Sequence, residues 1–244
     1  AIRIDRGSVS FAEPELTDFD RAATLINTAK HHEEFVLVAL DQPTVVPNAT
    51  GGRPVEKVAA SVISAIKGGV QPSSRSRQGM FDDSAPVWRF LRMIDCREAP
   101  ESARAANRGA YLIEVFPALA LASIVPLTWT RRAAAKYNPA NKNFSQNDWI
   151  LVCRSLEAIF QDYGFHAVSR WCSRAACLPV PNKADQDKLD AVICLLVALL
   201  YRYGGCGLET AMLGDLTSGY MITPCSKPVA ERLQASGHTR AIEV

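Results

Sequence analysis

The stretch KADQDKLDAVICLLVALLYR, residues 183–202, joins an acidic start to an almost entirely apolar second half. The apolar half predicts a helix buried in the core, and acids in a first turn stabilise the positive end of the helix dipole. This accounts for Asp185 and in part for Asp187. Asp190 is different, because AVICLLVALL follows it at once and places it inside the helix. The capping explanation therefore fits Asp190 poorly.

Asp187 and Asp190 are three residues apart, so we expect both carboxylates on one face of this helix. Like charges on one face repel each other unless a cation lies between them. A divalent metal ion is one candidate for that cation, and a nearby Lys or Arg side chain is the other. The helix alone leaves both interpretations open.

The composition is that of an ordinary globular protein, with 244 residues, 48% hydrophobic, 21% charged and a net charge of +2. This balance carries no general nucleic-acid signature, although it is compatible with a local basic patch. The seven cysteines include no C-x-x-C pair, which argues against a structural zinc site and indicates reduced thiols in a cytoplasmic protein. The longest apolar run, AVICLLVALLY, is too short to span a bilayer, so we expect no membrane partner.

Two apolar runs predict strands that end in acids. FVLVAL, residues 35–40, is bounded by charge, as in a strand buried on both faces of an α/β sheet, and Asp41 follows it directly. YLIEVFP, residues 111–117, predicts a second buried strand, which contains Glu114 and ends at Pro117. Sites in open α/β sheets lie at the carboxyl ends of parallel strands. If the two strands are neighbours, Asp41 and Glu114 meet there and the start of the acidic helix covers them.

Four carboxylates would then converge, namely those of Asp41, Glu114, Asp187 and Asp190. Each buried like charge raises the pKa of its neighbours, so such a cluster needs a cation. Oxygen ligands suit Mg²⁺ or Mn²⁺, and two ions about 4 Å apart stabilise the attacking and leaving oxygens of a phosphoryl displacement. Each acid also has a structural interpretation, Asp41 as a turn residue and Glu114 as an edge residue or a partner of Arg53.

The rest of the pattern predicts one mixed α/β domain over residues 1–244, with a basic insertion around 126–145. AIRIDRG and SVSFAEPEL predict two short strands joined by a turn at Arg6 and Gly7. GDLTSGYMITP predicts a late strand, with Asp215 as a turn residue. Helical periodicity or composition predicts helices over residues 17–32, 55–69, 87–94 and 146–164.

The motifs VALDQPTVVPNATGGRPVEK, YLIEVFPALAL, KYNP, DKLDAVICLLVAL and GDLTSGYMITP resemble, in this order and spacing, those of the domain of unknown function 429 family, the predicted RNase H-like nucleases. The resemblance covers residues 35–224. It implies a ribonuclease H-like mixed sheet flanked by helices, related to Holliday-junction resolvases, and an acidic site for two ions, Mg²⁺ or Mn²⁺. Carried over by motif, the catalytic and metal-binding residues are Asp41, Glu114, Asp187 and Asp190.

One departure from the family concerns its first strand, which carries an Asp and precedes the hairpin. We expect this strand to be missing before Ala1, because the spacing from Asp5 to Asp41 leaves little room for two strands and a helix. Asp5 is therefore not predicted as a ligand. Complete two-metal chemistry would require the acid of the missing strand.

Basic and aromatic side chains offer a surface to a nucleic-acid partner, since they neutralise phosphates and stack on bases. The candidates are Arg131, Arg132, Lys136, Trp129 and Tyr137 in the basic segment, and Arg75 and Arg77 in PSSRSRQG. The alternative is that these residues are ordinary solvated members of a set of 27 basic residues. Arg53, just past the loop after Asp41, either clamps a phosphate or pairs with Glu114 or Asp41.

The predicted function is a metal-dependent nuclease that hydrolyses phosphodiester bonds of DNA or RNA by a two-metal mechanism. The alternative is a catalytically silent nucleic-acid or protein binding module on the same fold, because a fold does not dictate a function. A third reading is an ATP-dependent kinase-like protein. The chain lacks G-x-x-x-x-G-K-[ST], but the kinase-like superfamily does not use that loop, so thermal stabilisation by nucleotide is the observation that separates this reading.

Overall fold

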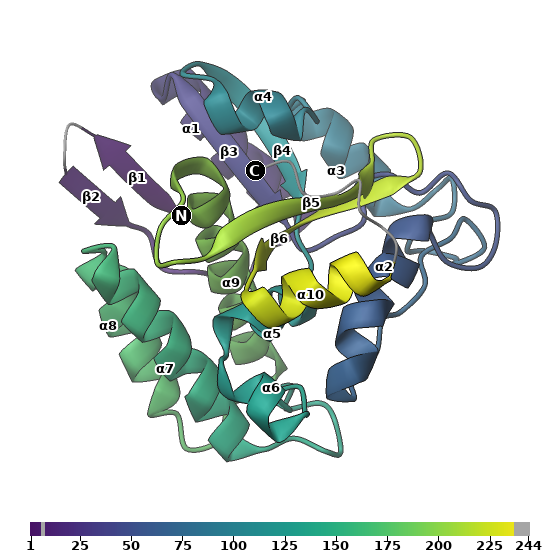
Figure 1. The fold of residues 1–244 in the computed structure, drawn as a ribbon. Coiled ribbons are helices and arrows are strands. Elements are labelled where there is room, and N and C mark those ends of the chain that lie inside the picture. Colours follow the sequence, from purple (N-terminus) through teal and green to yellow (C-terminus); the bar gives the residue numbers. More distant parts are fainter. Residues whose placement is uncertain (6–7, 237–244) are drawn as a thin grey trace.

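The structure is a computed structural model that describes residues 1–5 and 8–236 of the 244-residue chain. It is a mixed α/β protein in which helices flank small sheets (Figure 1). The strand pairs are β1 (Ile2–Asp5) with β2 (Ser8–Phe11), β3 (Phe35–Leu40) with β4 (Gly109–Glu114), and β5 (Glu209–Asp215) with β6 (Gly219–Cys225). The helices are α1 (Phe19–His32), α2 (Pro54–Ile63), the short η1 (Ser64–Ile66), α3 (Pro86–Ile94), α4 (Pro100–Ala105), α5 (Pro117–Ile124), α6 (Leu127–Arg131), α7 (Gln146–Asp162), α8 (His166–Ala176), α9 (Lys183–Tyr203) and α10 (Lys227–Ala235).

The two strands expected to carry the site are neighbours. β3 and β4 run parallel along their whole length, and Leu40 is the partner of Glu114 at the carboxyl end. Asp41 follows Leu40, so the two acids lie at the same end of the strand pair, as predicted. Just beyond β4, Val115 forms a parallel bridge to Ile222 of β6, which brings the β5–β6 hairpin beside β4.

The prediction that β3 is buried on both faces is wrong. All six of its residues are only partly buried, whereas the last four residues of β4 are buried. In the described part of the chain, β3 pairs only with β4, while α9 and α1 contact it. A continuous apolar run indicates that a strand contacts helices, but it does not distinguish an inner strand from one with a free edge.

The acidic helix predicted from residues 183–202 is α9, and it forms the centre of the largest core. Asn182 caps it: the Asn182 side chain accepts a hydrogen bond from the Asp185 N–H at 3.2 Å, and the Asp185 carboxylate accepts one from the Asn182 N–H at 3.0 Å. Most residues from 189 to 201 are buried against α5, α7, β3 and β6. Asp185 is therefore a capping residue, and Asp190 is carried into the interior.

Several elements have no counterpart among the predicted ones, namely α4, α5, α6, α8, α10 and β5. Pro117 ends the β4 segment as expected, but it also begins α5, because a proline has no N–H to leave unpaired and a fixed φ that suits the first helical position. α8 packs along α7, and Figure 1 shows this helix pair on one side of α9. Together these helices close the core that the predicted elements leave open.

The remaining predicted elements are present. β1 and β2 form an antiparallel hairpin, while the predicted turn residues Arg6 and Gly7 lie outside the described residues. The four predicted helices correspond to α1, α2 with η1, α3 and α7. Asp215 is a turn residue, since its carboxylate accepts hydrogen bonds from the N–H groups of Thr217 and Ser218, both at 2.7 Å.

The seven cysteines are all free thiols, and several of them lie inside the core. None of the described helices combines the length and the apolar character that a membrane crossing requires.

Candidate functional site

A pocket of about 320 Å³ lies where the predicted acids were expected to meet. Asp41 enters it from the end of β3, and Asp190 enters it from α9. The start of α5, the glycine pair after η1 and the basic segment form the rest of the wall. The polar residues that line this pocket are Asp41, Asp190, Gln186, Tyr137, Lys136, Asn138 and Asn141.

Asp190 is buried, with 8% of its surface exposed, and each of its carboxylate oxygens accepts a hydrogen bond. The Tyr137 hydroxyl donates to Oδ1 at 2.7 Å, and the Gln186 amide donates to Oδ2 at 2.6 Å. Burial raises the pKa of Asp190 to about 6, although the bonds from Tyr137 and Gln186 and the charge of Lys183 oppose this rise. The burial of Tyr137 and the nearby Asp190 charge raise the pKa of the Tyr137 hydroxyl, which therefore remains a donor.

Asp41 is the less constrained member of the pair. No group of the described residues donates a hydrogen bond to its carboxylate, and the residue is exposed on the open side of the pocket. Loss of hydration in the pocket and the negative charge of Asp190 raise the pKa of Asp41 to about 7, while Lys183 opposes the rise. Solvent reaches this carboxylate from the open side, so hydration moderates the effect. A proton or a cation is therefore favoured between Asp41 and Asp190.

Glu114 is buried, with 1% of its surface exposed, and it is neutralised by the protein itself. Its two carboxylate oxygens accept hydrogen bonds from Arg53, from Nη2 to Oε1 at 2.6 Å and from Nη1 to Oε2 at 2.9 Å. The Thr44 N–H adds a third bond at 2.9 Å to Oε2. Of the alternatives open for Glu114 and Arg53, the structure contains their mutual ion pair. A metal ion at Glu114 would have to displace a bidentate guanidinium group.

Gly219 in the β5–β6 hairpin makes room for the buried Arg53, and Gly214 makes room for the Gly219 backbone. Gly219 has a φ of +105°, and a Cβ added there would lie 2.8 Å from Cδ of Arg53. Gly214 has a φ of +79°, and a Cβ there would collide with the Gly219 carbonyl oxygen. Glu56 completes the cluster, because its Oε1 accepts a hydrogen bond from the Arg53 Nε at 2.9 Å. The guanidinium group is thus enclosed between α2, β4 and the β5–β6 hairpin.

Asp187 is exposed and is not among the residues that line the pocket. Its carboxylate pairs with Lys183 one turn earlier on α9, at 2.5 Å, and both side chains are about half exposed, at 46% and 55%. Of the two explanations for paired acids on this helix, the lysine is the cation that the structure contains. Asp187 lies one turn from the buried Asp190 and is close enough to raise its pKa.

The predicted phosphate-binding residues lie in different environments. Arg53 is fully buried and is not accessible to a phosphate. Arg131 is exposed but pairs with the buried Asp148 at 2.8 Å, and Arg132 is exposed at the end of α6 with a φ of +47°. Lys136 alone of the four lines the pocket, and its ammonium group donates to a backbone carbonyl at 3.2 Å.

The residues proposed for base stacking are mostly engaged elsewhere. The indole N–H of Trp129 donates to the Ala122 carbonyl at 2.7 Å, and Tyr137 is buried on Asp190. Arg75 stacks over the ring of Trp88, 4.4 Å from its centroid, and Arg77 lies in the same loop. Of these aromatic residues Tyr137 lines the pocket, but it is buried there with its hydroxyl bonded to Asp190.

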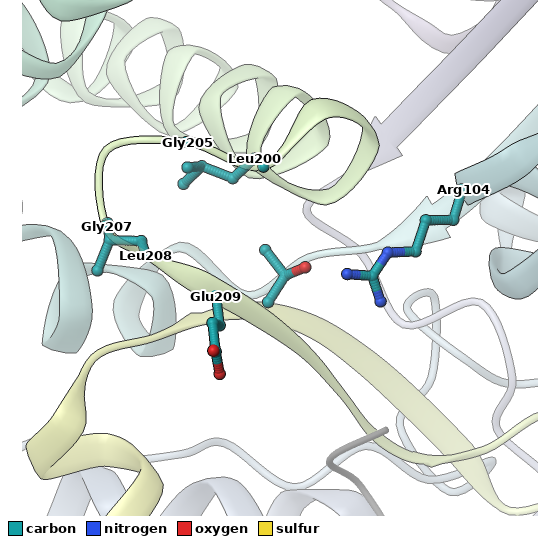
Figure 2. Close-up of a pocket in the computed structure, with 8 residues that line it drawn as sticks. Arg104, Leu200, Gly205, Gly207, Leu208 and Glu209 are labelled. Carbon is teal, nitrogen blue, oxygen red and sulfur yellow. The ribbon is translucent and has the colours of Figure 1, made fainter. Parts of the chain in front are cut away.

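A second pocket of about 360 Å³ lies at the other end of α9. The glycine-rich loop after α9 and the start of β5 line it, and Arg104 extends its guanidinium group into it (Figure 2). Arg104 and Glu209 are the charged lining residues, and no carboxylate pair is present. Its lining therefore differs from that of the pocket with Asp41 and Asp190, where the two carboxyl groups favour a bound cation.

The described residues contain no group of three or more His, Cys, Asp or Glu side chains arranged to hold a metal ion. The Asp41–Asp190 pair nevertheless fits the usual Mg²⁺ site, which uses one or two carboxylates and completes its shell with water and substrate phosphates. Each Asp190 oxygen keeps a second acceptor site beside its hydrogen bond. Asp41 and Asp190 are therefore the residues that would hold an ion here.

Two partners of the site were not identified as such from the sequence. Tyr137 was expected to stack on bases, and Gln186 was not singled out, yet both bind Asp190. The sequence does indicate that Gln186 can contact Asp190, because it lies four residues before Asp190 on the same face of the helix. Tyr137 lies in the KYNP motif, but its contact with Asp190 joins positions 53 residues apart and is not indicated by that motif.

The fold and the pocket thus define a mixed α/β protein with a partly buried pair of aspartates at the carboxyl end of parallel strands. The chain belongs to the DUF429 family, described as proteins of unknown function, whose match extends over residues 2–211. Neither the curated proteins nor the solved structures gave a significant match to this chain.

Proposed function

We propose that the protein is a metal-dependent nuclease that hydrolyses phosphodiester bonds of DNA or RNA, with Mg²⁺ or Mn²⁺ held by Asp41 and Asp190. The observation that carries the proposal is that Asp41, from the end of β3, and Asp190, from α9, line one pocket, and the raised pKa of both carboxyl groups, about 7 and about 6, supports it. Strongly perturbed carboxyl groups in a concave site are candidates for function on physical grounds. A ribonuclease H-like relationship, implied by the sequence motifs, belongs to the same proposal.

The chain's own residues have distinct roles in this proposal. Asp41, which has no competing donor, binds the ion first, and Asp190 binds it in an orientation set by Tyr137 and Gln186. Lys136 at the pocket wall attracts the substrate phosphate. When bound, a divalent ion supplies charge neutralisation at the phosphate and lowers the pKa of a water molecule.

The other two predicted acids have conditional roles. Asp187 can contribute to a second ion only by leaving Lys183, which is feasible for a half-exposed pair because such pairs contribute about 0–1 kcal/mol. Glu114 remains on Arg53 and fixes the end of β4, since breaking a buried pair leaves an uncompensated charge. A two-metal mechanism therefore depends on Asp187 leaving Lys183.

A catalytically silent binding module is the alternative, and one observation favours it. Arg53 already neutralises Glu114, which leaves fewer free carboxylates than a two-ion site uses. In that case the acidic pocket would bind a cation or a basic group without hydrolysis. Cleavage assays decide between these two functions.

The test is a Mn²⁺ titration by calorimetry on the wild-type protein, on Asp41→Asn and on Asp83→Asn as a control. Asp83 is matched in chemistry, but its side chain is 99% exposed and pairs only with Arg75. We expect Mn²⁺ to bind the wild type and Asp83→Asn alike and to bind Asp41→Asn at least about tenfold more weakly. Absence of binding to the wild type would refute the metal site.

Cleavage is then tested with Mg²⁺ and Mn²⁺ on single-stranded and duplex DNA and RNA. Products that appear with the wild type and vanish with Asp41→Asn support the nuclease. Metal binding without cleavage of any of these substrates supports the silent module. A rise in Tm with Mg²⁺ and ATP, greater than with Mg²⁺ alone, would instead support the kinase-like reading.

A further inference from the structure

The buried amide of Gln186 connects the pocket aspartate to a surface lysine. Gln186 is 7% exposed and lies on α9 between Lys183 and Asp190. Its Oε1 accepts a hydrogen bond from the Lys183 ammonium group at 2.8 Å, and its Nε2 donates to Asp190 at 2.6 Å. Both ends of the amide are therefore satisfied, as buried polar groups require.

The two partners fix which way round the amide lies. An ammonium group only donates and an ionised carboxylate only accepts, so a flipped amide would place its NH₂ group against Lys183 and its oxygen against Asp190. Lys183 and Asp190 together therefore hold the donor end of Gln186 toward the pocket. Neither Lys183 nor Gln186 is acidic, so a search for acidic residues in the sequence would not identify them.

Asp190 is thereby held from two sides. Gln186 binds Oδ2 from within α9, and Tyr137 binds Oδ1 from the basic segment. With one donor on each oxygen, rotation of the carboxylate breaks a hydrogen bond. Partners of this kind orient metal-binding side chains, and their removal typically weakens metal binding about 10–100-fold.

We propose that Gln186 is a positioning residue for Asp190, and that Lys183 supports this role by holding the acceptor end of the Gln186 amide. This inference rests on the proposed function, because it assigns Gln186 a role in presenting Asp190 to a divalent cation. It goes beyond the acids themselves by assigning function to a neutral residue that would not contact the cation.

The test measures Mn²⁺ affinity by calorimetry for two neutral replacements, Gln186→Met and Gln186→Asn. Methionine keeps the length without the amide, and asparagine keeps an amide that is too short to reach Asp190. The matched control is Gln146→Met. Gln146 lies at the start of α7, and its partly buried amide donates to the Leu178 carbonyl at 2.8 Å. All variants keep the charge of the site, so simple electrostatics predicts no change in affinity.

We expect both Gln186 variants to bind Mn²⁺ about 10–100-fold more weakly than the wild type, and Gln146→Met to bind it normally even if its Tm falls. A folded Gln186 variant with wild-type affinity overturns the positioning role while leaving the proposed metal site intact. Failure of both Gln186 variants to fold would make Gln186 a structural residue and overturn the proposal too. A wild type that binds no Mn²⁺ overturns the proposed function and this inference together.

Discussion

Replacing Asp41 with asparagine should stabilise the metal-free protein at about pH 8 and remove most of its response to Mn²⁺. The reason is that an ionised Asp41 has no hydrogen-bond donor among the described residues and faces the charge of Asp190. Asparagine has nearly the same shape and no charge. The substitution therefore removes repulsion without opening a cavity.

The size of the effect follows from the pKa of Asp41. A rise from 3.8 to about 7 corresponds to about 4 kcal/mol for a fully enclosed group. Asp41 is exposed to solvent on one side, so screening reduces the expected gain to about 1–2 kcal/mol. For a protein of this size that gain raises Tm by about 2–8 °C.

The pH dependence has a definite sign. A carboxyl group whose pKa is raised by folding binds its proton more tightly in the folded state than in the unfolded state. The metal-free wild type should therefore lose stability as pH rises from about 4 to about 7. Asp41→Asn should lose less, and Asp190, whose pKa is raised to about 6, and Glu114, whose pKa burial also raises, should contribute to its remaining slope.

The assay is thermal unfolding with and without Mn²⁺ on the wild type, Asp41→Asn and the exposed control Asp83→Asn. Free Mn²⁺ at about 100 times its Kd should stabilise the wild type by about 2.7 kcal/mol, enough to reverse the order of the two Tm values. The control should follow the wild type throughout. An Asp41→Asn variant that is less stable than the wild type without metal, or equally responsive to Mn²⁺, would refute the reasoning.

Three further predictions concern other parts of the site. Mn²⁺ should bind more tightly as pH rises from about 5 to about 8, because Asp41 and Asp190, whose pKa values are raised, must lose their protons before they bind the ion. If calorimetry gives the same Kd across this range, the two carboxyl groups are not the ligands. Arg53→Met should lower the free energy of unfolding by about 3–5 kcal/mol in urea titrations, since it leaves a buried carboxylate uncompensated, and a loss below about 1 kcal/mol would be inconsistent with that pair. Gly219→Ala should cost more than Gly51→Ala in the same assay, because both have positive φ but only the first places a Cβ against Arg53, and equal losses would exclude the steric contribution.

The sequence predicts the positions of the acids better than their partners. FVLVAL and YLIEV each indicate a strand from composition alone, and parallel pairing then brings Asp41 and Glu114 to one end. The apolar run after Asp190 likewise places that acid in the interior, where the structure has it. These inferences depend on local pattern and on general rules of sheet topology, both of which are present in a single sequence.

The partners depend on contacts between distant segments. Arg53 pairs with Glu114, 61 residues away, rather than with Asp41. This pairing depends on the space that Gly219 leaves in the β5–β6 hairpin, of which only the second strand was predicted. The Tyr137 hydroxyl reaches Asp190 only because an irregular basic segment folds back over α9. Neither contact is expressed in the periodicity or composition of the segments involved.

The acids at the start of α9 and at the ends of the strands have different structural roles. Asp185 caps the helix, Lys183 neutralises Asp187, and Arg53 neutralises Glu114. These pairings leave the Asp41 and Asp190 carboxyl groups as neighbours in the pocket. Burial raises the pKa of both, the charge of Asp190 adds to the rise at Asp41, and Lys183 opposes both rises. Every other acid of the predicted cluster forms an ion pair within the chain, so an external cation is most favoured between Asp41 and Asp190. An ion bound there would therefore relieve repulsion that Lys183 reduces only in part, and for this reason the Asp41–Asp190 pair is the part of the fold to test first.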